Sequence, residues 1–497
     1  MANGMQNVEH LVVLMLENRS LDNTLGWTWQ DTGNRPTVTL PAGSTAPYEG
    51  LVADVANPNQ GTYWNPKNAD FFYGAPPDKI LIQRGASDYT VPDPDPEELF
   101  KHMTYQIFGP QPALPSTPNT MLGFYLDYLG AAKGDATVAR QIMESYTPAQ
   151  LPVLNALARA FAVSDAWFGS CPCQTWPNRS FVHTGTSNGR VNNGTIPNPF
   201  HFDIPTVFNV LDQRGVSWGV YNDTRLISLT RLQFPKLWSF GLGSRFQGLN
   251  HWKSLAANGS LPTYSFLEPS FVFLPNDEHP PHDMRRGEQL LSEVWQAVST
   301  SPAWDKILLV IMFDEHGGCS DHVTPSFAAV TPDAASNPGQ DGFTFNRFGP
   351  RIPLVLVSPW IAAGTVFRTD NGTPYDHTSI LATLRDWLSI PPQDFLTSHR
   401  ITHAPTLDQV LSLDQPRQDL PVIPPPPAGE PLEVAMTEPP NVIQDSMVMA
   451  AEAARLGRPL APPEAAEWRA RLLTRADAGM LIPLRESQLG EDLERMY

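Results

Sequence analysis

The sequence predicts an α/β fold of three layers, in which a mostly parallel central sheet carries helices on both faces. Two continuous apolar runs, 11–16 and 307–313, have the composition of strands buried on both sides, as in parallel sheets. Strand-like and helical patterns alternate between residues 121 and 388, which is typical of a doubly wound sheet. Long loop-rich stretches and a final segment of different composition add loop insertions and a C-terminal helical tail to this prediction.

Composition limits the classes of protein and partner. With 497 residues, of which 41% are apolar, the chain is long enough for one large α/β domain with insertions and an appendage. The formal net charge of −18 argues against binding to nucleic acid or to an anionic membrane surface, because both require a basic patch. Cys171, Cys173 and Cys319 are too few for a disulfide framework, so small buried side chains are expected at these positions.

Sequence features also bear on the location of the protein. No stretch reaches the roughly 20 apolar residues of a membrane span. The N-terminus has no basic region followed by an apolar segment and a cleavage site, so no signal peptide is recognised. Three alternatives stay open: a cytoplasmic protein, export by a leaderless route as a secreted effector, and a leader that was removed.

The elements follow along the chain in this order. Residues 28–120 are rich in Pro, Asn, Gly and Asp and predict a long loop region, with a helix that starts near Glu97. Besides the two apolar runs, strands are predicted at 218–221, 261–269 and 352–360, and helices at 121–133, 135–145, 151–168, 202–214, 286–299 and 376–388.

Composition divides the chain into three parts. Residues 1–412 form the main domain, 413–440 a proline-rich linker, and 441–497 a helical tail. Two tail helices are predicted, at 441–457 and at about 463–476. The tail is predicted to pack on the domain as a terminal arm, and contact with an oligomer or another partner is the alternative.

Acidic and amide side chains follow both apolar runs where each strand ends. Glu17 and Asn18 follow the first run, and Asp314 and Glu315 follow the second. Ligands bind outside the carboxyl ends of strands in such sheets, so the four side chains are expected to converge if the strands are neighbours. Four oxygen ligands predict a divalent metal ion, with Ca²⁺, Mg²⁺ or Mn²⁺ as natural occupants and Zn²⁺ still open.

The segment QTWPNRSF carries a candidate nucleophile. Thr175 lies just ahead of Pro177, which suits the first turn of a helix. Its hydroxyl can attack phosphorus while backbone N–H groups hold phosphate oxygens, and a metal ion would lower the pKa of that hydroxyl. Asn178 and Arg179 are predicted to bind the phosphate, and Asn18 is expected to bind substrate as well as the metal ion. The alternative is a capping threonine beside a structural arginine.

Three histidines are candidates for the same chemistry. His279 and His282 lie in EHPPH, where prolines keep the loop from becoming a helix. An imidazole there can donate to a phosphate oxygen or protonate a leaving alkoxide. His322, in DEHGGCSDHV, is predicted to bind substrate.

Five motifs together resemble a known family. ENRSLD, TWPNRSFVHTGTSNG, NDEHPPHD, FDEHGGCSDHV and YDHTS, in this order across roughly residues 8–390, resemble the bacterial and fungal phosphoesterases. That family holds phosphatidylcholine-type phospholipases C and AcpA-type acid phosphatases, and its fold is similar to the alkaline phosphatase superfamily. The resemblance does not cover the tail beyond residue 413.

The resemblance implies a role for each matching residue. Glu17, Asn18, Asp314 and Glu315 match the metal ligands, Thr175 matches the hydroxyl nucleophile, and His279 matches the histidine that contacts the phosphoryl group. His282 is assigned to catalysis with it. Three positions depart from the family pattern: Glu98 stands where lipases tend to have His, Leu21 replaces Phe, and Cys171 with Cys173 replaces a pair of small residues.

The resemblance therefore implies a metal-dependent phosphoesterase. A phospholipase C is favoured, which would hydrolyse glycerophospholipids to diacylglycerol and a phosphorylated head group through a phosphothreonine at Thr175. An acid phosphatase acting on small phosphate esters is the alternative within the family. An inactive binding module, with the tail as its working part, is the alternative of another class. A delivered lipase with a role in bacterial virulence would fit a leaderless chain.

Overall fold

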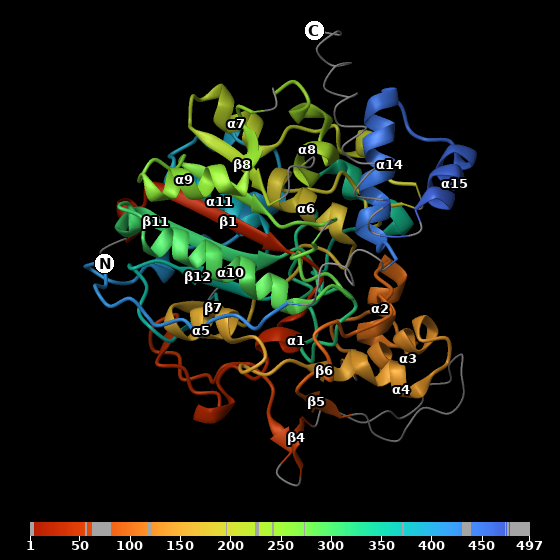
Figure 1. The fold of residues 1–497 in the computed structure, drawn as a ribbon, viewed down its shortest axis with the longest axis horizontal. Helices are drawn as coiled ribbons and strands as arrows, with labels where there is room; N and C mark the ends of the chain where they lie inside the picture. Colours follow the sequence, from red (N-terminus) through yellow and green to blue (C-terminus); the bar gives the residue numbers. More distant parts are fainter. Residues whose placement is uncertain are drawn as a thin grey trace.

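The computed structural model describes the chain as a three-layer α/β domain with a smaller sheet and a helical tail attached (Figure 1). The described residues are 4–54, 57–61, 81–117, 119, 121–194, 196–223, 228–240, 243–272, 274–369, 372–429, 439–472, 474 and 477. Parts of the predicted linker and most of the tail beyond α15 lie outside these residues, as does the stretch 62–80 of the loop region.

The central sheet confirms the predicted α/β class. Its nine described strands run in the order β2-β13-β7-β12-β11-β1-β10-β8-β9. Neighbouring strands are parallel except at β12, which is antiparallel to both β11 and β7. In that order the bounds are Val38–Leu40, Thr365–Phe367, Ala162–Ser164, Leu354–Val357, Ile307–Phe313, His10–Leu16, Tyr264–Glu268, Trp218–Asn222 and Phe246–Gly248.

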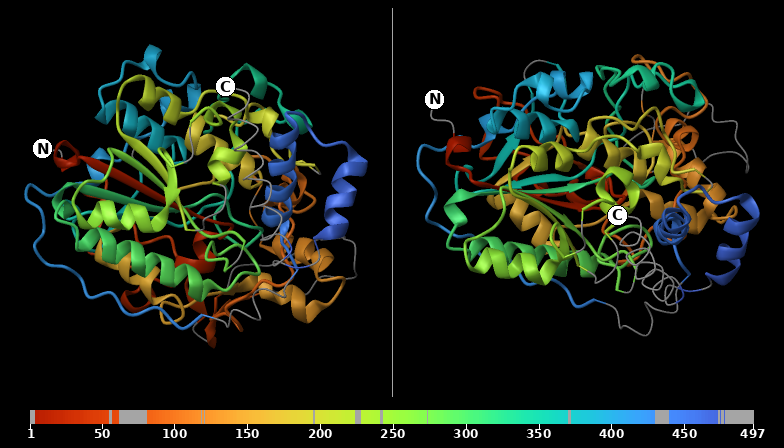
Figure 2. Two further views of the ribbon diagram at one scale, coloured as in Figure 1. Left: turned by 45° about the horizontal axis from the view of Figure 1, so that its top comes forward. Right: turned by 90° about the horizontal axis from the view of Figure 1, so that it is seen from above.

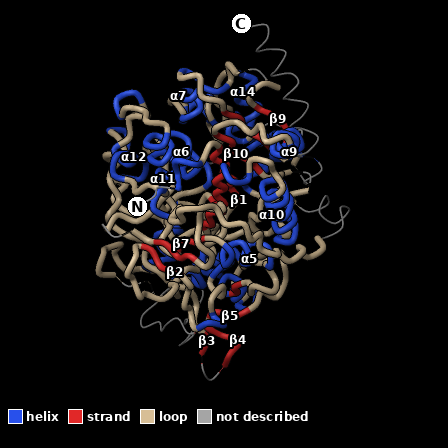
Figure 3. Tube along the Cα trace, turned by 90° about the vertical axis from the view of Figure 1, so that its left-hand side faces the viewer, coloured by secondary structure: helices blue, strands red, loops and turns tan. Residues whose placement is uncertain are grey.

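Helices cover both faces of this sheet, as Figure 3 shows with the strands between them. One face carries α5 (Pro152–Ala160), α9 (Leu249–Ala257) and α10 (Met284–Ser299). The other carries α6 (Thr175–Thr184), α11 (Thr378–Trp387) and α12 (His399–His403). β1 and β11 are enclosed by both layers, which is why their residues are apolar without alternation: every residue of β11 is buried, and only His10 of β1 is not fully so.

A smaller module lies below the main sheet in Figure 1. It contains a four-stranded sheet in the order β3-β4-β5-β6, with bounds Ala53–Asp54, Asn57–Gly61, Ile82–Arg84 and Glu144–Ser145. Its helices are α2 (Phe100–Phe108), α3 (Leu122–Ala131) and α4 (Ala136–Ala139). The loop region predicted at 28–120 therefore contains regular elements, namely β3, β4, β5 and α2 of this module.

Three predicted helices are wrong in part, and one of them, predicted at 202–214, begins only at Val207 as α7. The helix predicted at 151–168 ends at Ala160, because Ala162–Ser164 forms β7 between β12 and β13. A short buried strand and a short buried helix have the same continuous apolar pattern, so the sequence does not separate them. The helix predicted at 135–145 is α4 followed by a 3₁₀ turn and β6.

The tail returns to the domain. The linker carries no helix or strand in its described residues 413–429 and passes along the outside of the domain (Figure 2). Helix α14 (Val442–Leu456) then packs against α8 (Leu229–Gln233), and its buried side chains include Ile443, Met447 and Val448. Asn441 caps its first turn and Gly457 ends it in the left-handed region. Helix α15 (Pro462–Arg471) follows. None of the described helices has both the length and the apolar composition to cross a membrane.

Candidate active site

Strand register brings the four predicted oxygen ligands together. Leu16 pairs with Phe313 across parallel strands β1 and β11, so the residues that follow them leave the same edge of the sheet. The Asn18 N–H donates to Asp314 Oδ1 at 2.8 Å, and its side-chain amide donates to Glu315 Oε1 at 2.9 Å. Asn18 has a φ of 55°, a left-handed conformation that asparagine tolerates better than most residues.

Gly317 is required for this arrangement. It has a φ of 59°, and a Cβ atom placed on it would lie 2.1 Å from the carbonyl oxygen of Asn18. The loop after β11 therefore approaches the loop after β1 more closely than any side chain would permit.

Thr175 is the first residue of α6 and faces the same cluster. Its hydroxyl lies 3.4 Å from Glu17 Oε2 and 3.3 Å from Asn18 Oδ1. The N-terminus of a helix carries partial positive charge and unpaired backbone N–H groups, which favour an anion such as a phosphoryl group. The Thr175 hydroxyl, the Glu17 carboxylate and the Asn18 amide thus lie together at a helix N-terminus.

Arg179 lies one turn into the same helix and points at Glu17. Its Nε donates to Glu17 Oε1 at 2.8 Å, Nη2 contacts the same oxygen, and Nη1 lies 3.7 Å from Glu268. All three residues are fully buried. The guanidinium that was predicted to bind phosphate is therefore engaged with a carboxylate in this structure, and its contact with substrate stays a prediction.

Burial dominates the electrostatics of the cluster. It raises the pKa of Glu17 well above its usual range even though Arg179 opposes the shift, and it raises the pKa of Asp314 against the same opposition. The pKa of Glu315 is raised well above its usual range by burial and then by Asp314. Buried carboxylates of this kind call for a cation to keep them ionised.

The residues fit a hard divalent cation. Glu17, Asn18, Asp314 and Glu315 supply carboxylate and amide oxygens, and Asp314 Oδ2 is buried with no hydrogen-bond partner among the described residues. A bound cation would give that oxygen a partner. The assignment of these four residues as ligands stays a prediction.

His279 reaches the cluster from the loop between β10 and α10. Its Nδ1 lies 2.6 Å from the Pro280 carbonyl oxygen, and its Nε2 lies 3.7 Å from Glu98 Oε1. Burial lowers the pKa of His279 to about 4, so the imidazole is neutral at pH 7. Asp95, Glu98 and His279 can hold a metal ion, because one ligand atom from each lies within 4.8 Å of the others.

His282 is held on both sides. Its Nδ1 lies 2.6 Å from Asp277 Oδ1, and its Nε2 lies 3.3 Å from the side-chain amide of Asn441 and 3.4 Å from that of Gln444. The carboxylate fixes the ring orientation. Asn441 and Gln444 belong to the start of α14, so the tail contacts a predicted catalytic histidine.

Sequence comparison places this site in a known family. A family model described as the phosphoesterase family matches residues 8–391. The chain belongs to the phosphoesterase family. Non-specific phospholipase C3 of Arabidopsis thaliana is 32% identical over 460 residues, covering 90% of this chain and 82% of that protein. Non-specific phospholipase C6 of the same plant is 34% identical over 444 residues, covering 86% and 78%. Phospholipase C B of Mycobacterium tuberculosis is 28% identical over 424 residues, covering 78% and 74%.

Solved structures show more distant likenesses. An alkaline phosphatase superfamily protein from Vibrio parahaemolyticus is similar with a TM-score of 0.31 and 11% identity, covering 50% of this chain and 61% of that one. A phosphonate monoester hydrolase of Agrobacterium radiobacter is similar with a TM-score of 0.29 and 14% identity, covering 54% and 73%.

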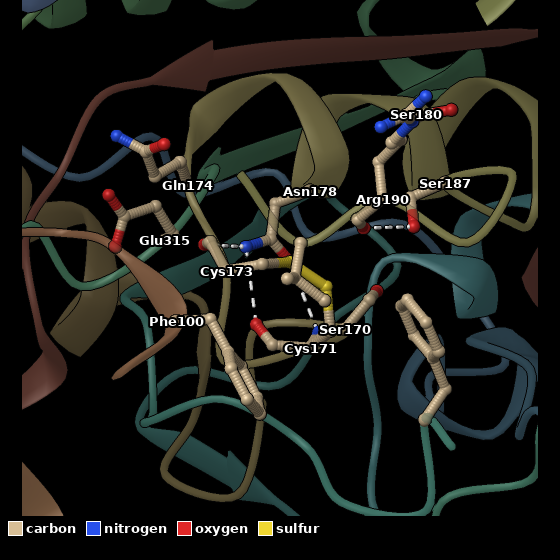
Figure 4. Close-up of a disulfide and its surroundings, with 12 residues drawn as sticks. Phe100, Ser170, Cys171, Cys173, Gln174, Asn178, Ser180, Ser187, Arg190 and Glu315 are labelled. Atoms are coloured by element: carbon tan, nitrogen blue, oxygen red, sulfur yellow. Dashed lines mark hydrogen bonds between the residues drawn. A yellow bond between two sulfur atoms is a disulfide. The ribbon is translucent and has the colours of Figure 1, made fainter. Parts of the chain in front are cut away.

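A disulfide precedes helix α6 of this phosphoesterase. Cys171 and Cys173 are buried, as expected, but are bonded to each other, with Cα atoms 5.3 Å apart (Figure 4). The expectation of two small unlinked side chains is wrong here, because a turn at the intervening proline brings both sulfur atoms together. Asn178 lies against this turn: its amide donates to the Cys171 and Cys173 carbonyls and accepts from the Cys171 N–H. Its predicted contact with substrate stays a prediction.

His322 lies in a separate ionic network. Its Nδ1 is 2.6 Å from Asp22 Oδ2 and its Nε2 is 3.3 Å from Glu49 Oε1. Arg351 completes the network by donating to Asp22 and Asp321, both at 2.9 Å. The network joins α1 (Leu21–Leu25), which begins just after Asn18, to the loop after β11. Binding of substrate by His322 stays a prediction.

The stability contributed by His322 is expected to depend on pH. Burial alone would lower its pKa, but the ion pair with Asp22 outweighs burial and raises the pKa to about 9. The folded pKa exceeds the unfolded value of about 6.5, so the contribution is full below about pH 6.5 and is lost as the pH rises through 9. His322→Gln should therefore lower the free energy of unfolding by about 3 kcal/mol at pH 6 and by much less at pH 9.5. Urea unfolding of both proteins at the two pH values measures this, and an equal loss at both would contradict it.

Several residues of the site were outside the sequence prediction. Asp95 and Asp277 were not singled out, and Glu98 was noted only as a departure from the family pattern. Asp95 and Glu98 follow a loop without periodic pattern, and Asp277 lies two residues before His279 in NDEHPPHD. Only Asp277 could have been predicted from the sequence, because it is a carboxylate two residues from the predicted catalytic His279 and could orient the ring of a nearby histidine.

Proposed function

We propose that this chain is a metal-dependent phospholipase C that hydrolyses glycerophospholipids to diacylglycerol and a phosphorylated head group. The observation that carries the proposal is the Thr175 hydroxyl at the start of α6, within 3.4 Å of both Glu17 and Asn18. The names of the relatives add support, since those at 32–34% identity are non-specific phospholipases C.

The residues divide the work as follows. Glu17, Asn18, Asp314 and Glu315 would hold the cation, which when bound supplies charge neutralisation and lowers the pKa of the Thr175 hydroxyl. The Thr175 hydroxyl gives up its proton as Oγ attacks phosphorus, the bond from phosphorus to the diacylglycerol oxygen breaks, and that oxygen takes up a proton to leave as diacylglycerol. Water then attacks the phosphothreonine, which releases the phosphorylated head group and restores the hydroxyl.

Other groups of the chain position this reaction. The N-terminus of α6 directs the partial positive charge of the helix toward the phosphoryl group, although its Trp176 N–H donates to Asn193 Oδ1 and Pro177 has no N–H. Arg179 holds Glu17 in place through two contacts with one of its oxygens and leaves the other oxygen directed at Thr175. Thr175 is 1% exposed and Glu17 is 0% exposed, which excludes bulk water from the reacting atoms.

A substrate panel with and without EDTA tests the proposal. The panel compares phosphatidylcholine, phosphatidylethanolamine, sphingomyelin and p-nitrophenyl phosphate as a simple monoester. We expect diacylglycerol and phosphorylated head group from the glycerophospholipids, loss of at least 100-fold in rate after EDTA treatment, and recovery when a divalent cation is restored.

The same panel identifies the alternatives. Turnover of the monoester alone would replace the proposal with an acid phosphatase. An inactive binding module predicts no metal-dependent hydrolysis of any of the four esters, so that result would also overturn the proposal.

A further inference from the structure

A second cluster of ligand atoms adjoins the predicted metal ligands. It consists of Asp95, Glu98 and His279. The Asn18 side-chain amide donates to Glu98 Oε1 and also to Glu315 Oε1, so one amide lies between a residue of each cluster. The two groups of ligands are therefore neighbours that share Asn18 as their boundary.

The imidazole of His279 is oriented as a ligand. The Pro280 carbonyl oxygen can only accept a hydrogen bond, so the Nδ1 atom 2.6 Å away donates to it. Nε2 then carries a lone pair, is buried, and has no hydrogen-bond partner among the described residues. A histidine that gives one N–H to a backbone carbonyl and directs its other nitrogen at a carboxylate, here Glu98, has the usual geometry of a metal ligand, while Asp95 Oδ1 lies 3.7 Å from Nδ1.

The distance from His279 to Glu98 also leaves room for a cation. The lone pair of Nε2 faces Glu98 Oε1 at 3.7 Å, which is too long for a hydrogen bond. Two ligands on one metal ion lie roughly 3–4.4 Å apart when each bond is about 2.0–2.2 Å long. A cation between the two atoms converts a repulsive contact into two bonds.

The number of buried carboxylates also favours a second cation. Glu17, Asp314 and Glu315 of the first group are buried, as is Glu98, and Asp95 is largely so. Arg179 pairs with Glu17, and one divalent cation would offset two further carboxylates. The buried Arg19 guanidinium acts on Asp95, but no lysine or arginine among the described residues pairs with Glu98, and a buried carboxylate of this kind is costly unless it meets a positive charge.

We propose that Asp95, Glu98 and His279 bind a second divalent cation, which makes the centre around Thr175 a two-metal site. The proposal rests on the proposed function, which assigns the first cation to Glu17, Asn18, Asp314 and Glu315. One imidazole nitrogen and two carboxylates suit Zn²⁺ or Mn²⁺ better than Ca²⁺, whereas the first group supplies only oxygen. Two adjacent cations can bind the attacking and leaving oxygens of one phosphoryl group.

Metal stoichiometry tests the second site without relying on activity. The full-length protein is stripped with EDTA, dialysed against Mn²⁺ and then against metal-free buffer, and the manganese per chain is measured by mass spectrometry. We expect two ions in the unmodified protein and one in Glu98→Gln, which keeps the shape and the acceptor for Asn18 but removes the charge. Asp95→Asn tests the same site independently should Glu98→Gln fail to fold, and circular dichroism checks each variant.

A neighbouring residue provides the matched control. Glu97 is adjacent in sequence, but its side chain is 48% exposed and lies 3.9 Å from His102. Glu97→Gln should therefore keep two ions. Asp314→Asn should keep one, bound at the second site, and the double variant with Glu98→Gln should bind none.

Three other results would contradict the second metal site. One ion in both the unmodified protein and Glu98→Gln would overturn the second site and leave the proposed function standing. Two ions in both would also overturn it, because the second ion would then lie elsewhere. No bound ion in the unmodified protein would overturn the proposed function as well.

Discussion

Replacing Thr175 by alanine is expected to lower phospholipid hydrolysis by about 10⁴-fold or more, since removal of a nucleophile removes the covalent route altogether. The change deletes one hydroxyl and one methyl group at the first position of α6, where Gln174 and Pro177 still define the helix start. The fold and the predicted metal ligands should therefore remain. Release of diacylglycerol by the metal-loaded protein measures the loss.

Two further variants make this result specific. Thr175→Ser keeps a hydroxyl and should retain measurable activity. Thr184 ends the same helix, and its hydroxyl donates to the Ser180 and Thr186 carbonyls, so Thr184→Ala should change stability without approaching that loss in rate. Acid quenching of the unmodified protein during turnover should leave the phosphorylated head group on the Thr175 peptide. A folded, metal-loaded Thr175→Ala protein that still turns over would contradict the mechanism.

The central strands were predictable because burial on both faces leaves a strong signal. β1 and β11 are seven residues each, and all of these residues except His10 are apolar. β2, β7, β9 and β13 are three residues each, too short for any period to show. Their places in the sheet depend on pairing with strands far away in the sequence, such as β7 with β12 and β13.

The site residues that follow long strands were predictable, and those placed by loops or by the tail were not. Glu17, Asn18, Asp314 and Glu315 directly follow long strands, so a rule about strand ends was enough to expect them in one place. Asp95 and Glu98 come from a loop, and their approach to His279 depends on how the smaller module packs against the main sheet. Asn441 comes from the tail and reaches His282 across 159 residues of sequence. Local patterns carry no information about such contacts.

The sequence could not determine which groups Arg179 and Asn178 contact, whereas the structure shows their partners. Arg179 and Asn178 were both predicted to bind phosphate from their place beside Thr175. The structure engages Arg179 with Glu17 and Asn178 with the turn at the disulfide. Both side chains can bond to many partners, and only the fold determines which of them lie within reach.

Replacing Arg351 by methionine is expected to lower the free energy of unfolding by about 3–5 kcal/mol, the usual effect of removing one partner from a buried ion pair. Arg351 is fully buried and donates to the Asp22 and Asp321 carboxylates and to the Glu49 and Asp165 carbonyls. Burial already raises the pKa of Asp321 to about 6 with Arg351 present. Without the guanidinium, both carboxylates lose their shared donor, and His322 is the cation left beside Asp22.

A surface pair shows whether burial is the reason for this effect. Arg214 lies 2.9 Å from Asp394 with side chains that are 34% and 49% exposed, so Arg214→Met should cost only about 0–1 kcal/mol. Urea unfolding of the two variants gives the comparison, and equal losses would show that burial is not decisive. The Arg351 network also ties α1, just after Asn18, to the loop that follows Asp314 and Glu315. Arg351→Met should therefore weaken cation binding as well, because Glu17 and Asn18 would no longer be held in place relative to Asp314 and Glu315.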